Sequence, residues 1–184
     1  MNATVDCVND SCRVGILSDT HGWLDPRVEA VLRGCNVLVH AGDIGDDKLL
    51  SSLSAMTDRL VAVAGNNDLF SRRWSVSGKQ PPDLAESATL VLPGGTLEIE
   101  HGHRIRDTRH YPECLRYKYP QARAVIFGHT HQQLVDRSRL PWVLNPGAAG
   151  RARTHDGPGC LILNIASGNW TLATYRFEVQ RRFG

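Results

Sequence analysis

The sequence is organised around five short apolar runs, each of which ends in a cluster of glycine and polar residues. The runs read RVGIL, NVLVH, LVAVA, TLEIE and AVIF, and the clusters after them contain DTHG, GD, GNND, HGH and GHTH. The runs occupy residues Arg13–Leu17, Asn36–His40, Leu60–Ala64, Thr96–Glu100 and Ala124–Phe127. Apolar runs that stop at glycine and polar residues are typical of buried strands. The chain is therefore predicted to carry polar side chains at the ends of five strands.

Two helices are predicted between the first three strands. Pro26–Arg33 begins with a proline, which suits the first helical turn, and Gly34 follows it. Asp47–Met56 has helical spacing of its apolar residues. The resulting order of elements, βαβαβ, indicates an α/β fold with a buried, largely parallel sheet.

The second half of the chain is predicted to be rich in strands. Pro-Gly-Gly between Thr89–Leu92 and Thr96–Glu100 indicates a β-hairpin. Further strands are predicted at Trp142–Leu144, Cys160–Ile165 and Trp170–Phe177. Two packed sheets with helices outside would close such a chain. Tyr111–Tyr119 is predicted to be a helix over the core and is a candidate contact in a homo-oligomer, and the polar stretch Phe70–Ser87 is predicted to be a long lid or binding loop.

Length and composition fit one globular domain of 184 residues, of which 41% are hydrophobic and 22% charged. The net charge of +2 argues against a nucleic-acid partner, and no apolar run approaches the roughly 20 residues that cross a membrane. The amino-terminal residues lack the pattern of a secretory signal. We expect a flexible lead-in over residues 1–12 and a single domain over residues 13–184. Five cysteines without a CxxC pair favour a reducing, cytoplasmic location.

The polar clusters are the candidate functional site. Parallel strands share one carboxyl edge, where α/β proteins bind their ligands, so clusters far apart in the sequence are expected to meet there. Five of the eight histidines fall in these clusters: His21, His101, His103, His129 and His131. Imidazole, carboxylate and carbonyl oxygen together suit Mn, Fe, Co, Ni or Zn. Two carboxylates and at least four imidazoles exceed one ordinary site but suit a pair of ions.

Each cluster by itself has a structural alternative. An aspartate after a strand is often a helix N-cap, and GNND is also a turn sequence because Asn and Asp tolerate left-handed backbone. The histidine pairs are also compatible with solvated or core positions. The metal interpretation therefore depends on the whole series of clusters.

That series resembles the calcineurin-like metallophosphoesterases, in which DTHG, GD, GNND, HGH and GHTH occur in this order. It is most similar to the small single-domain phosphodiesterase branch, which also contains the retromer scaffold subunit. Asn145-Pro146-Gly147 resembles the NPG segment of that branch, and the similarity covers roughly Val14 to Tyr175. The resemblance implies a four-layer α/β/β/α sandwich of two mixed sheets flanked by helices.

The resemblance also implies roles for individual residues. Asp19 and His21, helped by His131, would bind a first metal, and Asp43 would bridge two ions. Asn66, His101 and His129 would complete a second site. Of these, the residues expected to act directly in catalysis are Asp43, Asn66 and His101. Residues expected to contact substrate or to support the ligands are Asn67, Asp68 and His103.

The implied activity is that of a dinuclear metal-dependent phosphodiesterase, which hydrolyses a small phosphate ester by attack of a metal-bridging hydroxide. Two divalent transition-metal ions are expected, with Mn first and Fe, Ni, Co or Zn as alternatives. A phosphomonoesterase and a non-catalytic metal-binding scaffold of the same fold are the other candidates. Asn67 departs from the wider family, in which many members carry a histidine that assists the leaving group, and the proton donor is therefore left open.

Overall fold

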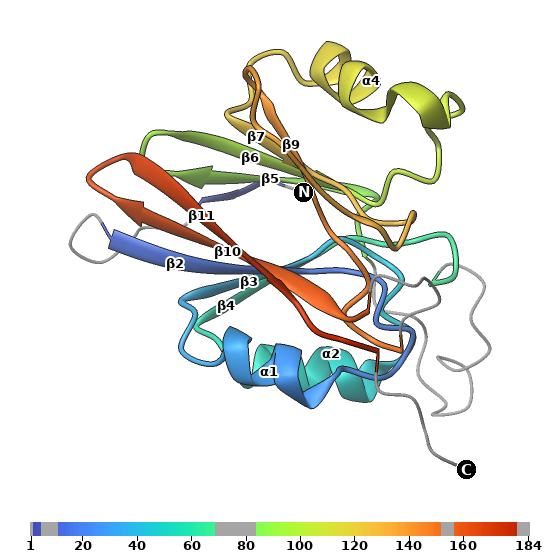
Figure 1. The fold of residues 1–184 in the computed structure, drawn as a ribbon. Coiled ribbons are helices and arrows are strands. Elements are labelled where there is room, and N and C mark those ends of the chain that lie inside the picture. Colours follow the sequence, from blue (N-terminus) through green and yellow to red (C-terminus); the bar gives the residue numbers. More distant parts are fainter. Residues whose placement is uncertain (1, 5–10, 69–83, 152–156, 180–184) are drawn as a thin grey trace.

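The computed structural model of the chain describes residues 2–4, 11–68, 84–151 and 157–179, and its ribbon forms four layers (Figure 1). Two β-sheets face each other in the middle, with α1 and α2 outside one sheet and α4 outside the other. The helices are α1 (Pro26–Leu32), α2 (Asp47–Ser54) and α4 (Tyr111–Lys118). This arrangement confirms the predicted α/β/β/α sandwich.

The first sheet has five strands in the order β11-β10-β2-β3-β4. Its strands are β2 (Ser11–Leu17), β3 (Val37–His40), β4 (Arg59–Ala62), β10 (Gly159–Ala166) and β11 (Asn169–Arg176). Strands β2, β3 and β4 are parallel, whereas β10 is antiparallel to both of its neighbours. The carboxyl ends of the three parallel strands therefore lie at one edge.

The second sheet has six strands in the order β1-β5-β6-β7-β9-β8. Its strands are β1 (Asn2–Thr4), β5 (Ser87–Leu92), β6 (Gly95–Glu100), β7 (Ala124–Ile126), β8 (Gln133–Asp136) and β9 (Trp142–Pro146). The hairpin β5–β6 and the parallel trio β6, β7 and β9 make this sheet mixed as well. Both sheets are thus mixed, as predicted.

Alternating side chains of the strands divide the core into layers. Ile16 and Val39 pack between the two sheets against Leu97, in one large buried cluster. Their neighbours Leu17 and Leu38 belong to a second cluster, which α1 and α2 cover. Successive residues of a strand point to opposite faces, so β2 and β3 are buried on both sides and read as continuous apolar runs.

Helices α1 and α2 begin where the sequence provides capping groups. The Asp25 side chain accepts a hydrogen bond from the Arg27 N–H at the start of α1, and Asp46 accepts one from the Leu49 N–H at the start of α2. On the other side of the molecule, α4 buries Leu115 and leaves the Tyr117 side chain 90% exposed. An exposed tyrosine keeps this helix a candidate oligomer contact.

Some boundaries differ from the expectation. Strand β2 begins at Ser11, and β1 lies within the lead-in expected over residues 1–12. Strand β8 was not predicted, because QLVD is a short, half-exposed edge strand. Strand β5 begins at Ser87, inside the predicted loop Phe70–Ser87, and residues 69–83 of that loop lie outside the described residues.

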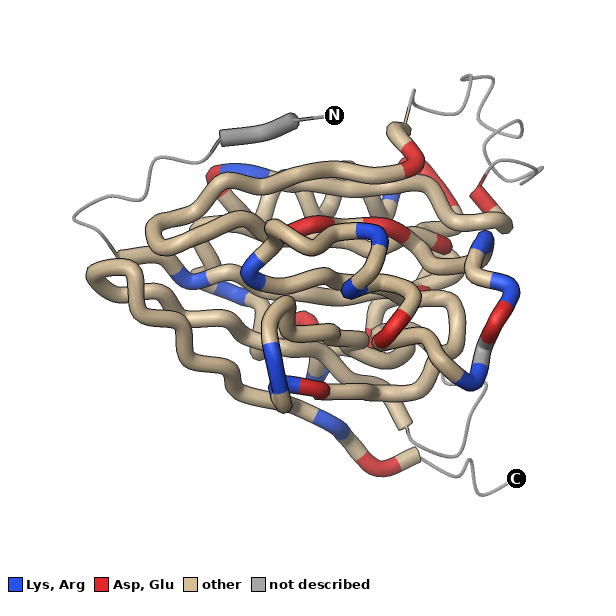
Figure 2. The backbone as a smooth tube through the Cα atoms, turned by 90° about the horizontal axis from the view of Figure 1, so that it is seen from above, with Lys and Arg blue, Asp and Glu red and all other residues tan. Residues whose placement is uncertain are grey.

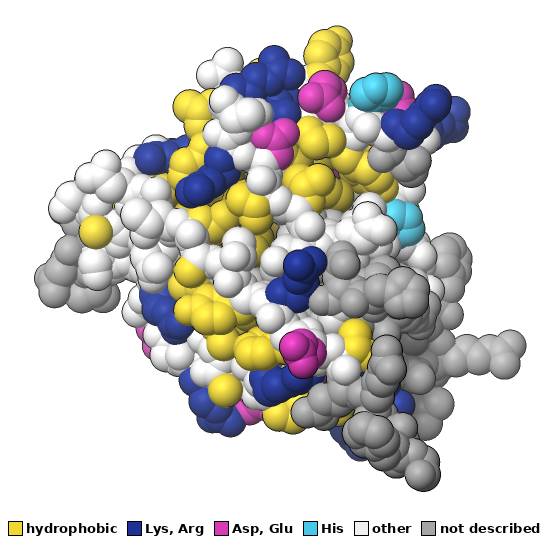
Figure 3. All heavy atoms as spheres, in the orientation of Figure 1, with side chains coloured by type: hydrophobic (Ala, Val, Ile, Leu, Met, Phe, Trp, Pro, Cys, Tyr) yellow, Lys and Arg dark blue, Asp and Glu magenta, His cyan; other side chains and the backbone are white. Residues whose placement is uncertain are grey.

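Charged residues of both signs are interspersed along the described backbone (Figure 2), in keeping with the small net charge. On the face in Figure 3, hydrophobic side chains lie in patches between charged ones. Among the described residues, no helix is long and apolar enough to cross a membrane.

Candidate metal centre

The loops after β2 and β3 are bound to each other by backbone hydrogen bonds. The Asp19 N–H donates to the Gly42 carbonyl at 3.0 Å, and the His21 N–H donates to the Asp43 carbonyl at 2.9 Å. These bonds extend the pairing of the parallel strands β2 and β3 past the ends of the strands. The side chains of the DTHG and GD clusters are therefore held side by side at the carboxyl edge of the sheet.

The candidate ligands have an unusual backbone conformation. Six non-glycine residues in the described part of the chain have positive φ, and five of them are expected ligands: Asp19, His21, Asp43, His129 and His131. Their φ values lie between 49° and 67°. The left-handed region disfavours residues with a Cβ, and such residues gather at functional sites where the surrounding structure holds them. Backbone geometry thus marks the same residues as the sequence motifs.

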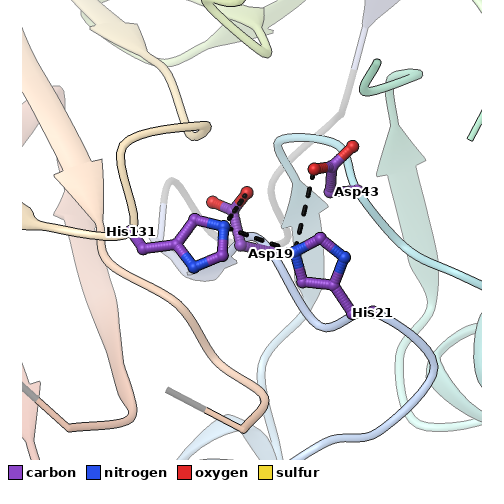
Figure 4. A group of neighbouring side chains, drawn as sticks. All are labelled: Asp19, His21, Asp43 and His131. Atoms are coloured by element: carbon purple, nitrogen blue, oxygen red, sulfur yellow. Dashed lines mark hydrogen bonds and ion pairs between the residues drawn. The ribbon is translucent and has the colours of Figure 1, made fainter. Parts of the chain in front are cut away.

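One group of four side chains converges at the edge of the sheet (Figure 4). Asp19, His21, Asp43 and His131 each offer one ligand atom, and these atoms all lie within 4.8 Å of one another. His131 Nε2 is 3.4 Å from Asp19 Oδ1, and His21 Nε2 is 3.7 Å from Asp43 Oδ2. Both carboxylates are almost wholly buried. This group has the donors and spacing to hold one divalent cation.

His101 and His129, two residues expected to hold the second ion, also lie close to the two carboxylates. His101 Nε2 is 3.5 Å from Asp43 Oδ2, and His101 Nδ1 is 2.7 Å from the Ala41 carbonyl. Because a carbonyl only accepts, Nδ1 carries a proton, and Nε2 is the ring nitrogen that faces the carboxylate. Burial lowers the pKa of His101, but the Asp43 and Asp19 carboxylates outweigh burial and raise it. The His129 ring lies 5.2 Å from the His101 ring, and the His129 N–H donates to Asp19 Oδ2. The HGH cluster thus meets the first group at Asp43, and the GHTH cluster meets it at Asp19.

Two buried atoms on residues expected to hold the second ion bear on whether a cation fits. Asn66 Oδ1 and His101 Nε2 are both buried, and neither has a hydrogen-bond partner within the described ranges. Buried polar atoms are nearly always paired, since leaving one unpaired costs about 1–3 kcal/mol. A carbonyl oxygen and an imidazole lone pair are both metal donors, so the residues present fit a bound divalent ion.

Burial and neighbouring charges shift the pKa values in this cluster. Burial raises the pKa of Asp19 to about 7, although the adjacent His101 acts in the opposite direction. Burial alone would also raise the pKa of Asp43, but the imidazole of His101 and the amide of Asn67 lower it below its ordinary value. Burial lowers the pKa of His129, which favours the neutral ring that ligates metals.

Asn67 and Asp68 support the loops around Asp43. The Asn67 N–H donates to Asp43 Oδ1 at 2.9 Å, and the Asn67 side-chain amide donates to Asp43 Oδ2 at 2.6 Å. Asp68 is buried and accepts hydrogen bonds from the N–H groups of Ile44, Gly45 and Gly65. The GNND cluster therefore fixes the position of Asp43, a role for Asn67 that its sequence position alone did not indicate.

His103 lies at the margin of the cluster. Its ring is 5.5 Å from the His101 ring and 6.3 Å from the His129 ring, and it lines a pocket of about 70 Å³ with Arg104 and Lys118. The side chain is half-buried, and burial lowers its pKa. A role for His103 in contacting a substrate stays a prediction.

Asn145, from the NPG segment, ties the last two histidines to the sheet. Its side-chain amide donates to the Gly128 carbonyl at 2.8 Å, and its Oδ1 accepts from the Gly147 N–H at 2.8 Å. Because Gly128 directly precedes His129, this contact anchors the loop that carries the GHTH cluster. The motif drew attention to Asn145 in the sequence, but this contact required the structure.

The fold and the donor set together define a class: an α/β sandwich with a candidate divalent-metal centre at the carboxyl ends of its strands. The chain belongs to the calcineurin-like phosphoesterase superfamily, whose domain profile matches residues 12–168. This membership confirms the family that the motifs indicated.

Individual relatives are distant. The chain is 26% identical over 159 residues to a probable metallophosphoesterase of Methanocaldococcus jannaschii, covering 80% of this chain and 73% of the relative. It is 23% identical over 143 residues to a phosphodiesterase of the same archaeon, covering 73% and 82%. Vacuolar Protein Sorting 29 from Cryptosporidium parvum has a similar structure, with a TM-score of 0.71 at 16% identity, covering 91% of this chain and 98% of that one.

Proposed function

We propose that the chain is a dinuclear metal-dependent phosphodiesterase. The observation that carries this proposal is the position of Asp43, whose Oδ2 lies 3.7 Å from His21 Nε2 and 3.5 Å from His101 Nε2. In this proposal the Asp43 carboxylate, which is near donors of both expected sites, is the ligand that the two ions would share. Sequence similarity to an archaeal phosphodiesterase supports the substrate class.

The residues of each group have complementary tasks in this proposal. Asp19, His21 and His131 would hold the first ion, and Asn66, His101 and His129 would hold the second. When bound, a pair of divalent ions polarises a phosphoryl oxygen and activates a water as nucleophile. Asn67 keeps the shared carboxylate of Asp43 in one orientation through its two hydrogen bonds. Mn²⁺ is the ion we propose, because the donors combine imidazole with hard oxygen atoms.

The charge of the donor set favours an anionic substrate. Two divalent ions bring four positive charges, and Asp19 and Asp43 are the two carboxylates among the proposed ligands, so about two positive charges remain. A phosphodiester monoanion approaching this site is attracted, and its reaction develops further negative charge that the site stabilises. His103, at the margin of the cluster, is positioned to contact the ester.

Two other functions are alternatives to this proposal. A phosphomonoesterase would use the same ligands on a substrate with one more ionised oxygen. A non-catalytic scaffold of the same fold is supported by the structural similarity to Vacuolar Protein Sorting 29. The retained carboxylate, imidazole and carboxamide donors favour an enzyme over a scaffold.

The test combines metal analysis with two chromogenic esters. Metal-free protein is titrated with Mn²⁺ by calorimetry and then assayed with bis-p-nitrophenyl phosphate and p-nitrophenyl phosphate. We expect close to two ions per chain and faster release of p-nitrophenol from the diester. Preference for the monoester would support the phosphomonoesterase, and two bound ions without hydrolysis of either ester would support the scaffold. Failure to bind metal would overturn all three interpretations.

A further inference from the structure

A buried histidine outside the proposed ligand set contacts the loop that carries two of the ligands. His40, the last residue of β3, is completely buried, and its Nε2 lies 2.8 Å from Thr20 Oγ1. Thr20 is itself buried and lies between Asp19 and His21 in the sequence. The pair therefore connects the end of β3 to the DTHG cluster.

The hydrogen-bond roles in this pair follow from the partners of the hydroxyl. Thr20 Oγ1 is 2.9 Å from the Ile44 carbonyl oxygen, and two oxygens approach so closely when a proton lies between them. The single hydroxyl proton is thus donated to Ile44, and Oγ1 accepts from His40. His40 must therefore carry its proton on Nε2, while the buried Nδ1 has no hydrogen-bond partner among the described residues.

The arrangement links three segments at the edge of the sheet. His40 belongs to the strand that leads to Asp43, and the Thr20 hydroxyl connects the DTHG loop to the carbonyl of Ile44, which follows Asp43. Asp19 and His21, on either side of Thr20, both have left-handed backbone, with φ of 55° and 49°. Such backbone persists when surrounding contacts hold it. The hydroxyl is one of these contacts, and the imidazole orients the hydroxyl.

We propose that His40 is a positioning residue of the metal centre, which acts through the Thr20 hydroxyl to hold Asp19 and His21 in ligating orientation. The burial of the imidazole supports this role, because a leucine of similar volume would fill the space without leaving Nδ1 unpaired. Burial also lowers the pKa of His40 to about 3, so the ring stays neutral. This inference rests on the proposed metal-dependent function.

The test measures metal binding in preference to turnover. Metal-free wild type, Thr20→Val, Thr20→Ser, His40→Leu and His40→Gln are titrated with Co²⁺ by calorimetry, and their absorption spectra report the coordination geometry. We expect Thr20→Val to weaken Co²⁺ binding by about 10–100-fold, as for other contacts that orient ligands. The loss should appear at the site of lower affinity or at both sites. Thr20→Ser, which retains the hydroxyl, and His40→Gln, which retains an N–H, are expected to stay close to wild type.

The coupling between the two residues separates positioning from general stability. If His40 acts through Thr20, His40→Leu in the Thr20→Val background should weaken binding little beyond Thr20→Val alone. Thr57→Val is the matched control, because the Thr57 hydroxyl also donates to a backbone carbonyl, that of Asn36, away from the cluster. It should leave Co²⁺ affinity and spectrum unchanged even where it lowers the melting temperature.

The outcomes distinguish the inference from the function on which it rests. Wild-type affinity and spectrum in folded Thr20→Val would overturn the role of His40 while leaving the proposed function intact. A wild type that binds no Co²⁺ would overturn both. If Thr20→Val does not fold, Thr20→Ala takes its place, since it removes the hydroxyl without adding a methyl group against the same neighbours.

Discussion

The side-chain amide of Asn67 lies 2.6 Å from Oδ2 of Asp43, while the Asn67 N–H donates to Oδ1 of the same carboxylate. Both oxygens of the proposed bridging ligand are thus held by one residue. We therefore expect Asn67→Ala, which keeps only the backbone contact, to weaken Mn²⁺ binding by about 10–100-fold. Calorimetric titration measures this change, and Asn36→Ala, remote from Asp43, provides a control of the same chemistry. Equal affinity in the two variants would contradict the role of Asn67.

Replacing the shared carboxylate itself should have a larger effect on turnover. Asp43→Asn removes the charge between the two donor groups, and we expect kcat on bis-p-nitrophenyl phosphate to fall by about 10²–10³-fold. The shape of the side chain is conserved, so far-ultraviolet circular dichroism should stay unchanged. The exposed Asp58 serves as control through Asp58→Asn. Near wild-type turnover in Asp43→Asn would exclude the bridging role.

Removal of metal should lower stability as well as activity. Without a cation, the structure has to keep the buried Asp19 and Asp43 close together, and buried atoms of Asn66 and His101 have no hydrogen-bond partner among the described residues. A ligand at 100 times its dissociation constant stabilises a folded protein by about 2.7 kcal/mol per site. Thermal unfolding with chelator and with excess Mn²⁺ should therefore differ by several degrees. Identical melting temperatures would argue against a site in the folded chain.

Metal affinity should rise with pH. Burial raises the pKa of Asp19 to about 7, so below this pH the metal-free carboxyl is protonated and a metal ion must displace the proton. The proton on Asp19 by itself should make the affinity increase by up to about tenfold per pH unit below 7. Calorimetry in buffers of different ionisation enthalpy counts the released proton. Binding without proton release at pH 6 would show that Asp19 is already ionised there.

The raised pKa of Asp19 should make the stability of the metal-free protein fall with pH, whereas metal affinity rises with pH. The pKa of Asp19 is higher in the folded than in the unfolded chain, where it is about 4. Its contribution to the free energy of unfolding is thus fully present below about pH 4 and is lost as the pH rises through 7. In chelator, denaturant midpoints should fall over this window, and the fall should be absent in Asp19→Asn.

The hydrolysis rate of the wild type should depend strongly on the leaving group of the ester. The Asn67 amide is engaged with Asp43, so the residue at this position does not protonate a departing oxygen. The rate should therefore depend steeply on the pKa of the leaving group, with diaryl phosphodiesters cleaved far faster than dialkyl ones. A graded series of aryl esters gives the slope. A flat dependence would reveal a proton donor elsewhere, and His103→Gln would then test the nearest candidate.

The sequence predicted the two sheets with their outer helices and the loops that converge at the candidate site. Both can be predicted from the local pattern of apolar and polar residues. Apolar runs such as Arg13–Leu17 identify strands buried on both faces, and the polar clusters after them identify one sheet edge. Strand β8 was not predicted, because a half-exposed edge strand has little apolar periodicity in its sequence. The contact between Asn67 and Asp43 also escaped, as did that between His40 and Thr20. Such contacts depend on side-chain directions in loops, which no periodicity encodes.

The ligand loops are joined by contacts between residues that are distant in the chain. The His129 N–H binds Asp19 across 110 residues, and His101 reaches the Ala41 carbonyl across 60. We expect contacts of this kind to form late in folding, after the two sheets have docked, because the entropy cost of closing such long loops must be met first. The complete donor set would then be absent from the folding transition state. Bound Mn²⁺ should accordingly slow unfolding severalfold while leaving the folding rate almost unchanged. The metal would then increase the kinetic stability of the folded chain without helping the chain to fold.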